Sequence, residues 1–525
     1  MGIGTLTSKL LRSTAVVGQM TFISRALGFV RDVVIARSFG TSLAADAFFI
    51  AFKIPNLFRR LFAEGAFSQA FVPVLAEYRE KDGDPAVGDL IDATSGTLAI
   101  VLLAVVAIGV IAAPLVIAVF APGFIQDTDK LGLATALLRF TFPYLFFISL
   151  TALAGSILNT YGRFAVPAIT PVLLNVSLIF AAITLSPRLE QPVMALAIGV
   201  LVGGIAQLAL QLAALWRLGF VPKPTVAFAN KGVRKILGLM GPAMFGVSVA
   251  QINLMFDTLI ASFLQTGSIS WLYYSDRLVE FPLGVFGIAL ATVILPTLSA
   301  RHSESDPKSF SATLDWALRW VFLIGLPAAV GLVVLAAPML STLFQYGALG
   351  ERDVVMASRS LVAYSSGLMG FILIKVLAPG FFARQDMRTP VRIGVIAMVA
   401  NMVMNVVLVF PLAHAGLALA TTLSAYINAA LLFRALRRSG AYRSNTVWRP
   451  YLSRVALAGI AMGLVLWLSV EPVSAWSGWD VWTRAGQLSI WIAAGAATYF
   501  AVLWICGLRP RDMELQVSSS LSDLG

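Results

Sequence analysis

The strongest constraint on the fold of this chain is its series of long apolar segments. Segments of about 20 residues, the length that a helix needs to cross the hydrocarbon core of a bilayer, alternate with short stretches of Pro, Gly or charged residues. Of the 525 residues, 58% are hydrophobic and 12% are charged, and the mean hydropathy is +0.86. This composition excludes a water-soluble globule. The sequence therefore predicts an all-α integral membrane protein.

We predict about fourteen transmembrane helices from these segments. Their ranges are 14–38, 44–76, 90–120, 132–160, 165–186, 193–216, 236–264, 270–299, 313–343, 357–383, 391–411, 415–434, 451–470 and 484–507. The first segment contains arginines and is followed by no small-residue cleavage site, so we expect it to stay in the protein as a helix.

Lys and Arg are distributed unevenly between the predicted loops. The alternate loops that include the N-terminus hold nearly all of them, whereas the other loops hold Lys130, Arg188 and Arg352. Because loops rich in Lys and Arg stay in the cytoplasm, we predict that both termini are cytoplasmic. The formal net charge of +12 is then explained by topology and by anionic lipid headgroups, and no nucleic-acid partner is expected.

An internal repeat divides the predicted helices into two lobes. "IAAPLVIAVFAPG" (Ile111–Gly123) matches "LAAPMLSTLFQYG" (Leu335–Gly347), and "FVPVLA" matches "ILPTLS" in nearly the same register. About six spans separate equivalent positions, so the two repeats share their orientation in the membrane. We predict two six-helix lobes, 1–218 and 236–440, with a cytoplasmic linker at 219–235 and two extra helices within 441–525. Paired lobes favour alternating access around a site at their interface.

Charged residues interrupt three of the predicted helices. A charge at the bilayer centre costs at least ~2.5–3.5 kcal/mol, so each is a candidate functional residue. Helical geometry places the polar residues of the first two of these helices on one stripe each, and Arg37 faces the opposite side of the first helix. The stripes consist of Ser24, Arg25, Arg31 and Asp32 on the first helix and Asp46, Lys53, Asn56, Arg60 and Glu64 on the second, with Arg59 next to Asn56. The eighth helix carries Asp276, Arg277 and Glu280.

Two interpretations of these charges remain open. They could neutralise one another as ion pairs that hold the helices together. The candidate pairs are Arg31–Asp32, Arg60–Glu64 and Arg277–Glu280. Cations outnumber acids in the set, however, and the guanidinium fork binds phosphate or carboxylate through two hydrogen bonds. The sequence therefore also indicates a site for an anionic amphiphile.

Three long motifs stand out in the sequence: "SRALGFVRD", "DAFFIAFKIPNLFRRLFAEGAFSQAFVPVLAEY" and "YYSDRLVEFPLGVFGIAL". They resemble the MurJ (MviN) family of lipid II flippases, within the multidrug/oligosaccharidyl-lipid/polysaccharide (MOP) exporter superfamily, and the resemblance extends from Leu10 to about Leu508. It implies a fourteen-helix protein of the bacterial inner membrane. Such a protein carries lipid II, the undecaprenyl-diphosphate-linked disaccharide-pentapeptide, to the periplasmic face for peptidoglycan synthesis and cell shape.

The resemblance also implies roles for individual residues. Arg25, Arg31, Arg59 and Arg277 match the cavity arginines that bind the diphosphate. Asp32, Asp46, Asn56, Arg60 and Glu64 match other polar positions of the cavity or gate, and Ser24, Lys53, Asp276 and Glu280 lie on the same three helices. The last two helices resemble those that form a groove for the polyprenyl tail, with simple packing or a partner interface as alternatives. The expected partners are lipid II, membrane lipids and other cell-wall synthesis proteins.

A possible cation site is the last predicted feature. Asp257 has no charged neighbour in "INLMFDTLIASF" on the seventh helix. Asn401, Asn405 and Thr422, on the eleventh and twelfth helices of the same lobe, offer neutral oxygens of the kind that a hard cation prefers. The group resembles the sodium site of some family members, so we expect coupling to Na⁺ or to the membrane potential and no other cofactor. The alternative is that Asp257 is protonated or hydrogen-bonded in the core.

Three alternatives to a lipid II flippase remain. An ion-coupled drug exporter of the MATE type would share the fold, but a cationic cavity disfavours cationic drugs. A flippase for another undecaprenyl-linked glycan would need the same arginines. A membrane-embedded enzyme would need a metal-binding carboxylate motif or a nucleophile with its base, and the sequence contains neither, so no enzymatic activity is expected.

Overall fold

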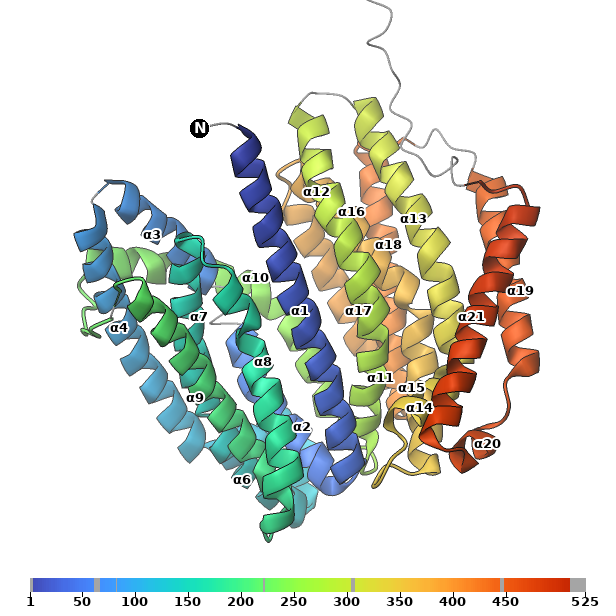
Figure 1. Ribbon diagram of the computed structural model, residues 1–525, viewed down its shortest axis with the longest axis horizontal. Coiled ribbons are helices and arrows are strands. Elements are labelled where there is room, and N and C mark those ends of the chain that lie inside the picture. Colours follow the sequence, from blue (N-terminus) through green and yellow to red (C-terminus); the bar gives the residue numbers. More distant parts are fainter. Residues whose placement is uncertain are drawn as a thin grey trace, which may run out of the picture. The chain divides into compact units, whose positions relative to one another are not determined.

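The computed structural model describes residues 3–60, 67–81, 83–220, 222–303, 307–443 and 448–509. Within these ranges every regular element is a helix (Figure 1). The contacts between helices divide the chain into two compact units, and the boundary in the sequence falls between Ser270 and Trp271.

The described part of the first unit contains ten α-helices and three short helical turns. They are α1 (Ile3–Phe39), α2 (Leu43–Phe58), α3 (Ser68–Lys81), α4 (Gly83–Ile111), α5 (Ala113–Phe120), η2 (Pro122–Gln126), α6 (Thr128–Thr141), α7 (Tyr144–Thr160), α8 (Ala165–Phe180), η3 (Ala181–Leu185), η4 (Ser186–Arg188), α9 (Met194–Arg217) and α10 (Lys231–Ala261). α10 packs against α3, α4 and α5. The seventh predicted helix therefore packs with helices of the first unit, whereas the sequence predicts it in the second lobe.

The second unit begins within α11 (Ser268–Pro282). The elements that follow are η5 (Leu283–Gly287), α12 (Ile288–Ser303), α13 (Pro307–Val334), α14 (Ala336–Phe344), α15 (Glu351–Ser366), α16 (Leu368–Phe382), α17 (Arg388–Leu412), α18 (His414–Arg438), α19 (Trp448–Ser469), α20 (Val473–Gly478) and α21 (Val481–Ile505). The two extra helices, α19 and α21, pack against each other and against α13. Their shared core includes Val455, Leu466 and Tyr499.

Eleven helical segments among the described residues are long and apolar enough to cross a membrane. The chain is therefore a multi-pass membrane protein, as its composition predicts. The other three predicted spans coincide with α1, with α2 and α3, and with α10. The count of fourteen and the cytoplasmic position of the termini stay predictions.

The matching segments of the predicted repeat contain the same local break. α4 ends at Ile111 and α5 begins at Ala113, and α13 ends at Val334 before α14 begins. The residues between them have nearly equal dihedral angles, with φ −83° and ψ 11° at Ala112 and φ −90° and ψ 14° at Leu335. In both segments a proline lies in the first turn after the break, where its missing N–H costs no helical hydrogen bond. The repeat relation itself remains a prediction.

Candidate functional site

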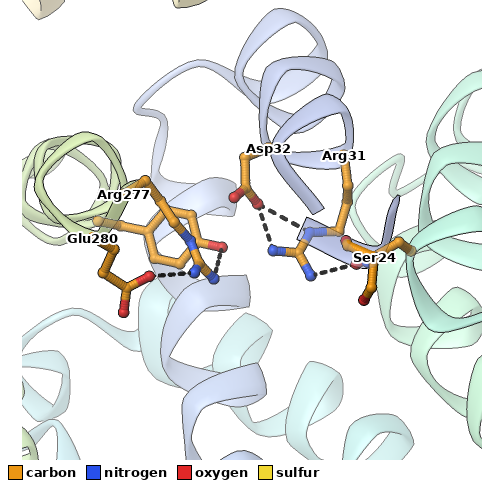
Figure 2. Close-up of polar contacts among 7 residues, drawn as sticks. Ser24, Arg31, Asp32, Arg277 and Glu280 are labelled. Atoms are coloured by element: carbon orange, nitrogen blue, oxygen red, sulfur yellow. Dashed lines mark hydrogen bonds and ion pairs between the residues drawn. The ribbon is translucent and has the colours of Figure 1, made fainter. Parts of the chain in front are cut away.

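Arg31 is buried in α1 and held from two sides. Its Nε and Nη2 donate to Oδ1 of Asp32 at 2.9 and 2.7 Å, and its Nη1 donates to Oδ1 of Asn175 on α8 at 3.0 Å (Figure 2). The Asn175 amide nitrogen in turn donates to the carbonyl of Ser24. Arg31 and Asp32 are 7% and 1% exposed. α1 therefore carries a buried ion pair, and an amide oxygen from a neighbouring helix accepts a further hydrogen bond from the guanidinium.

α1 approaches α8 closely at this position. A Cβ on Gly28 would lie 3.5 Å from the Asn175 side-chain nitrogen, which is ordinary van der Waals contact. A larger residue at Gly28 would therefore displace the amide that positions Arg31.

Arg25 and Arg37, two further arginines of α1, are exposed within the first unit. Arg25 lies six residues before Arg31, and no hydrogen bond or ion pair joins it to another described residue. Arg37, near the end of the helix, is also exposed, and Ser24 is half-buried. The stripe predicted on this helix thus contains one neutralised and one available guanidinium.

Asp46, in the first turn of α2, is buried and fully engaged. Its Oδ2 accepts from the backbone N–H of Gly267 at 2.7 Å, and its Oδ1 accepts from the N–H and the hydroxyl of Ser270 at 2.9 and 2.6 Å. Asp46 therefore fixes the connection between α10 and α11, and in this structure its carboxylate is committed to that role.

The remaining polar residues of α2 lie toward its end. Lys53 donates to the hydroxyl of Thr258 on α10. Arg59 is half-buried and donates through Nε to Oδ1 of Asn56 at 3.1 Å, and Arg60 is exposed. Glu64 lies outside the described residues, so the predicted Arg60–Glu64 pair stays a prediction.

Arg277 of α11 is held by two residues of its own helix in the second unit. Its Nη1 donates to Oε2 of Glu280 at 2.7 Å and its Nη2 donates to the hydroxyl of Tyr273 at 3.2 Å (Figure 2). The guanidinium also lies 5.1 Å from the centre of the Tyr273 ring. Both members of the ion pair are partly exposed, at 34% and 48%, and Asp276 is exposed.

The guanidinium groups of this set can bind an anion through paired hydrogen bonds. Among the described residues, no cluster of three His, Cys, Asp or Glu side chains could hold a metal ion. The Arg31–Asp32 and Arg277–Glu280 pairs occur as the ion-pair interpretation predicts. Arg25 shows that pairing among the described residues does not consume all the cations of the first unit.

The residues predicted to bind a cation are divided between the two units. Asp257 is half-buried on α10 in the first unit. Asn401 and Asn405 are buried on α17, where the Asn405 amide donates to the Asn401 side-chain oxygen at 2.9 Å. The Thr422 hydroxyl donates to the carbonyl of Ala363 at 2.7 Å. The Asn401 side-chain oxygen therefore already accepts a hydrogen bond within the second unit.

Sequence reasoning missed two residues of this region. Asn175 accepts a hydrogen bond from Arg31 although it lies 144 residues farther along the chain. In the sequence it is marked only as a lone amide in the apolar run "VLLNVSLIF". Arg484 is buried at the start of α21 and donates to the carbonyls of Ser341, Gln345 and Ser477 at 2.9–3.1 Å. It joins α21 to the end of α14, and a lone arginine at a predicted helix start did not distinguish it.

Comparisons with known proteins were made on the sequence and on the structure. A profile of the family described as Lipid II flippase MurJ matches residues 35–482. The chain is 51% identical to a probable lipid II flippase MurJ of Vibrio cholerae, over 97% of this chain and 98% of that one. It is 43% identical to the lipid II flippase MurJ of Burkholderia cenocepacia, over 95% and 98%.

Solved structures agree in fold. A lipid II flippase MurJ in an inward closed conformation superposes with a TM-score of 0.77 at 26% identity, covering 93% of this chain and 98% of that one. An inward-facing MATE-family multidrug resistance transporter of the MOP superfamily gives 0.67 at 15% identity, over 81% of this chain and 98% of that one, which is a likeness of fold alone.

Proposed function

The chain belongs to the MurJ family of lipid II flippases, and from this premise we propose how its own residues carry the lipid. The protein is a flippase, hence a transporter and not an enzyme, as the sequence predicted. We propose that it lies in the bacterial inner membrane and moves lipid II from the cytoplasmic to the periplasmic leaflet by alternating access, in support of peptidoglycan synthesis.

The observation that carries the proposal is the pair of arginines on α1. Lipid II is anchored by a diphosphate, and arginine is the side chain best suited to bind it through paired hydrogen bonds. Arg25 is exposed and unpaired among the described residues, so it offers a first contact. Arg31 is neutralised by Asp32 in the empty site. That site is therefore not left with an isolated buried charge before the diphosphate binds.

The same logic applies to Arg59 and Arg277. Arg59 is half-buried and donates a hydrogen bond to the neutral Asn56. Arg277 is paired with Glu280 at a partly exposed position, where the pair is weaker than a buried one. We propose that the diphosphate binds these two arginines together with Arg25 and Arg31. Ser24, Asp32, Asp46, Lys53, Asn56, Arg60, Glu64, Asp276 and Glu280 complete the polar cavity and its gate.

α19 and α21 are proposed to hold the polyprenyl tail. Their surface carries exposed large apolar side chains, including Leu464, Trp467 and Phe500. A long hydrocarbon chain needs such a surface, and the two helices stand outside the predicted repeat.

Coupling to Na⁺ or to the membrane potential is the remaining part of the proposal. A carboxylate with neutral oxygens is a donor set that suits a hard cation. In the second unit Asn401, Asn405 and Thr422 supply such oxygens, although one is already bonded. Asp257 would supply the charge from α10.

The proposed binding role is tested with purified protein in liposomes that carry lipid II. We expect Arg25→Ala and Arg31→Ala each to slow flipping by roughly ten- to a hundredfold, because each removes a charge-assisted hydrogen bond to the diphosphate. Arg37→Ala is the matched control, since this exposed arginine lies on the other side of the same helix. Lysine at position 25 or 31 should restore little of the flipping rate, because its ammonium group lacks the paired N–H donors of a guanidinium. Wild-type rates in both alanine variants would show that these arginines do not bind the substrate.

A further inference from the structure

An apolar cavity of about 260 Å³ lies between α4 and α10 in the first unit. Leu98 and Leu102 of α4 and Ile236 and Met240 of α10 contribute to its walls. It is smaller than the roughly 300–1,000 Å³ of typical small-molecule pockets. Its size and lining suit part of a slender hydrocarbon chain.

One polar group in the wall of this cavity is unsatisfied. Thr94 is 3% exposed, and its hydroxyl has no hydrogen-bond partner among the described residues. Buried hydroxyl groups in native proteins are nearly always hydrogen-bonded. The Thr94 hydroxyl therefore indicates that an occupant brings a polar atom to this level.

Basic residues lie at the end of α10 that borders the cavity. Lys231 and Arg234 are exposed in its first turn, and no ion pair joins either to a described residue. Arg234 donates through Nε to the carbonyl of Phe228 at 3.3 Å. Lys235 is committed to Glu77 on α3, and this hydrogen bond lowers the pKa of Glu77. The two available cations are thus the ones nearest the linker.

The levels of these groups follow from the packing of the two helices. α10 touches α4 at Gly232, where a Cβ would lie 2.4 Å from Cδ1 of Leu90. Thr94 and Ile236 each lie four residues farther along their helices, about 6 Å below that contact. Along α4 and α10, counted from their first turns, the two cations come first, the Thr94 hydroxyl comes next, and the apolar cavity follows.

The linker before α10 has the character of a membrane interface. The backbone N–H of Lys223 donates to Oδ1 of Asp92 at 2.7 Å, and that of Thr225 donates to the Asp92 carbonyl at 3.0 Å, so the linker is fastened to α4. Val226 and Phe228 nevertheless remain exposed, at 61% and 51%. Apolar side chains that alternate with lysine and arginine suit the headgroup level of a bilayer.

We propose that this cavity binds an acyl chain of an anionic phospholipid as a resident lipid. Lys231 and Arg234 hold the phosphate, the Thr94 hydroxyl donates to an ester oxygen, and the acyl chain runs past Leu98 toward Leu102. The site differs from the proposed substrate path in its residues, and it concerns a lipid that is not transported.

The experiment uses the full-length protein in phosphatidylcholine nanodiscs with a trace of phosphatidylglycerol that carries a photoactivatable acyl chain. Cross-links mapped by peptide mass spectrometry should fall in α4 and α10. Leu98→Trp fills the cavity and should reduce this labelling at least fivefold. Leu103→Trp is the matched control, because Leu103 lies on α4 but is 50% exposed and does not line the cavity.

Charge variants test the headgroup. Lys231→Gln with Arg234→Gln should weaken phosphatidylglycerol labelling by roughly 25-fold, about fivefold for each charge near an anionic group. Arg388→Gln with Arg392→Gln, two exposed arginines at the start of α17, should leave it unchanged. A phosphatidylcholine probe that labels α4 and α10 equally well would overturn the proposal.

Thr94→Val keeps the shape of the side chain and serves if Leu98→Trp fails to fold. It should weaken labelling severalfold, and unchanged labelling would contradict the role of the hydroxyl. Competition by lipid II would show that the cavity takes the transported lipid instead, and would equally overturn the proposal. Because labelling is measured without transport, these outcomes are independent of whether Arg25 and Arg31 carry the substrate.

Discussion

Arg31 and Asp32 form a buried ion pair in α1, and the proposed function adds a role in substrate binding for Arg31. Both side chains are buried, so neither charge could remain there without the other. Sequence analysis identified both residues and their pairing as one interpretation. It could not identify Asn175, because a lone amide in an apolar run gives no sign of which helix it faces.

Removing Asp32 alone should therefore destabilise the protein. We expect Asp32→Asn to lower the free energy of unfolding by about 3–5 kcal/mol, since it leaves the Arg31 guanidinium buried without its counter-charge. Thermal unfolding in detergent, compared with Asp89→Asn at an exposed position near the start of α4, measures the loss. Equal stability in the two variants would mean that Asp32 does not neutralise Arg31.

Removing both charges separates the two roles. Arg31→Met with Asp32→Leu should unfold near the wild-type temperature, because well-packed apolar residues often replace a buried pair without loss. Lipid II flipping in liposomes should nevertheless be abolished. If this double variant still flips at the wild-type rate, Arg31 has a structural role only.

At the scale of elements, apolar segments predict where helices lie but not where they break. The predicted span 90–120 is divided into α4 and α5, and the span 132–160 into α6 and α7. Hydropathy does not change at these breaks, so only Pro114 and Pro143 mark them in the sequence. The association of α10 with α3 and α4 was also beyond prediction, because the repeat indicates equivalence between helices and not their contacts.

Asp46 links two elements, and its removal should loosen their connection. Asp46→Asn retains the shape but weakens three hydrogen bonds to Gly267 and Ser270. We expect a loss of about 1–3 kcal/mol in stability and faster hydrogen exchange at residues 264–270. Ser270→Ala, which loses only the hydroxyl bond, should show a smaller effect in both measurements. The reverse order would assign the connection to Ser270.

For the whole molecule, the loop charges make topology a testable prediction. Single cysteines placed within 265–270, 411–416 or 471–480, in a Cys506→Ser background, should react with impermeant thiol reagents added outside intact cells. Cysteines near 228 or 440 should react only after permeabilisation. The opposite pattern would reverse the orientation and place the basic linker outside.

The direction of transport requires an energy source, and two are compatible with the charges of this chain. The membrane potential contributes about 2.3 kcal/mol per elementary charge at 100 mV, so it acts on moving arginines and on the anionic substrate without a bound ion. A sodium gradient would instead act through Asp257 of α10, with the neutral oxygens of Asn401, Asn405 and Thr422.

Flipping in proteoliposomes is measured with sodium and potential varied independently. If Na⁺ is the coupling ion, the wild type should depend on it and Asp257→Asn should lose that dependence while retaining its response to the potential. Asn253→Asp is the matched control, because it places a carboxylate one turn earlier on the same helix and so tests whether the position of the charge matters. Sodium dependence that is equal in the wild type and Asp257→Asn, or absent from both, would eliminate Asp257 as the coupling residue and leave the potential as the driving force.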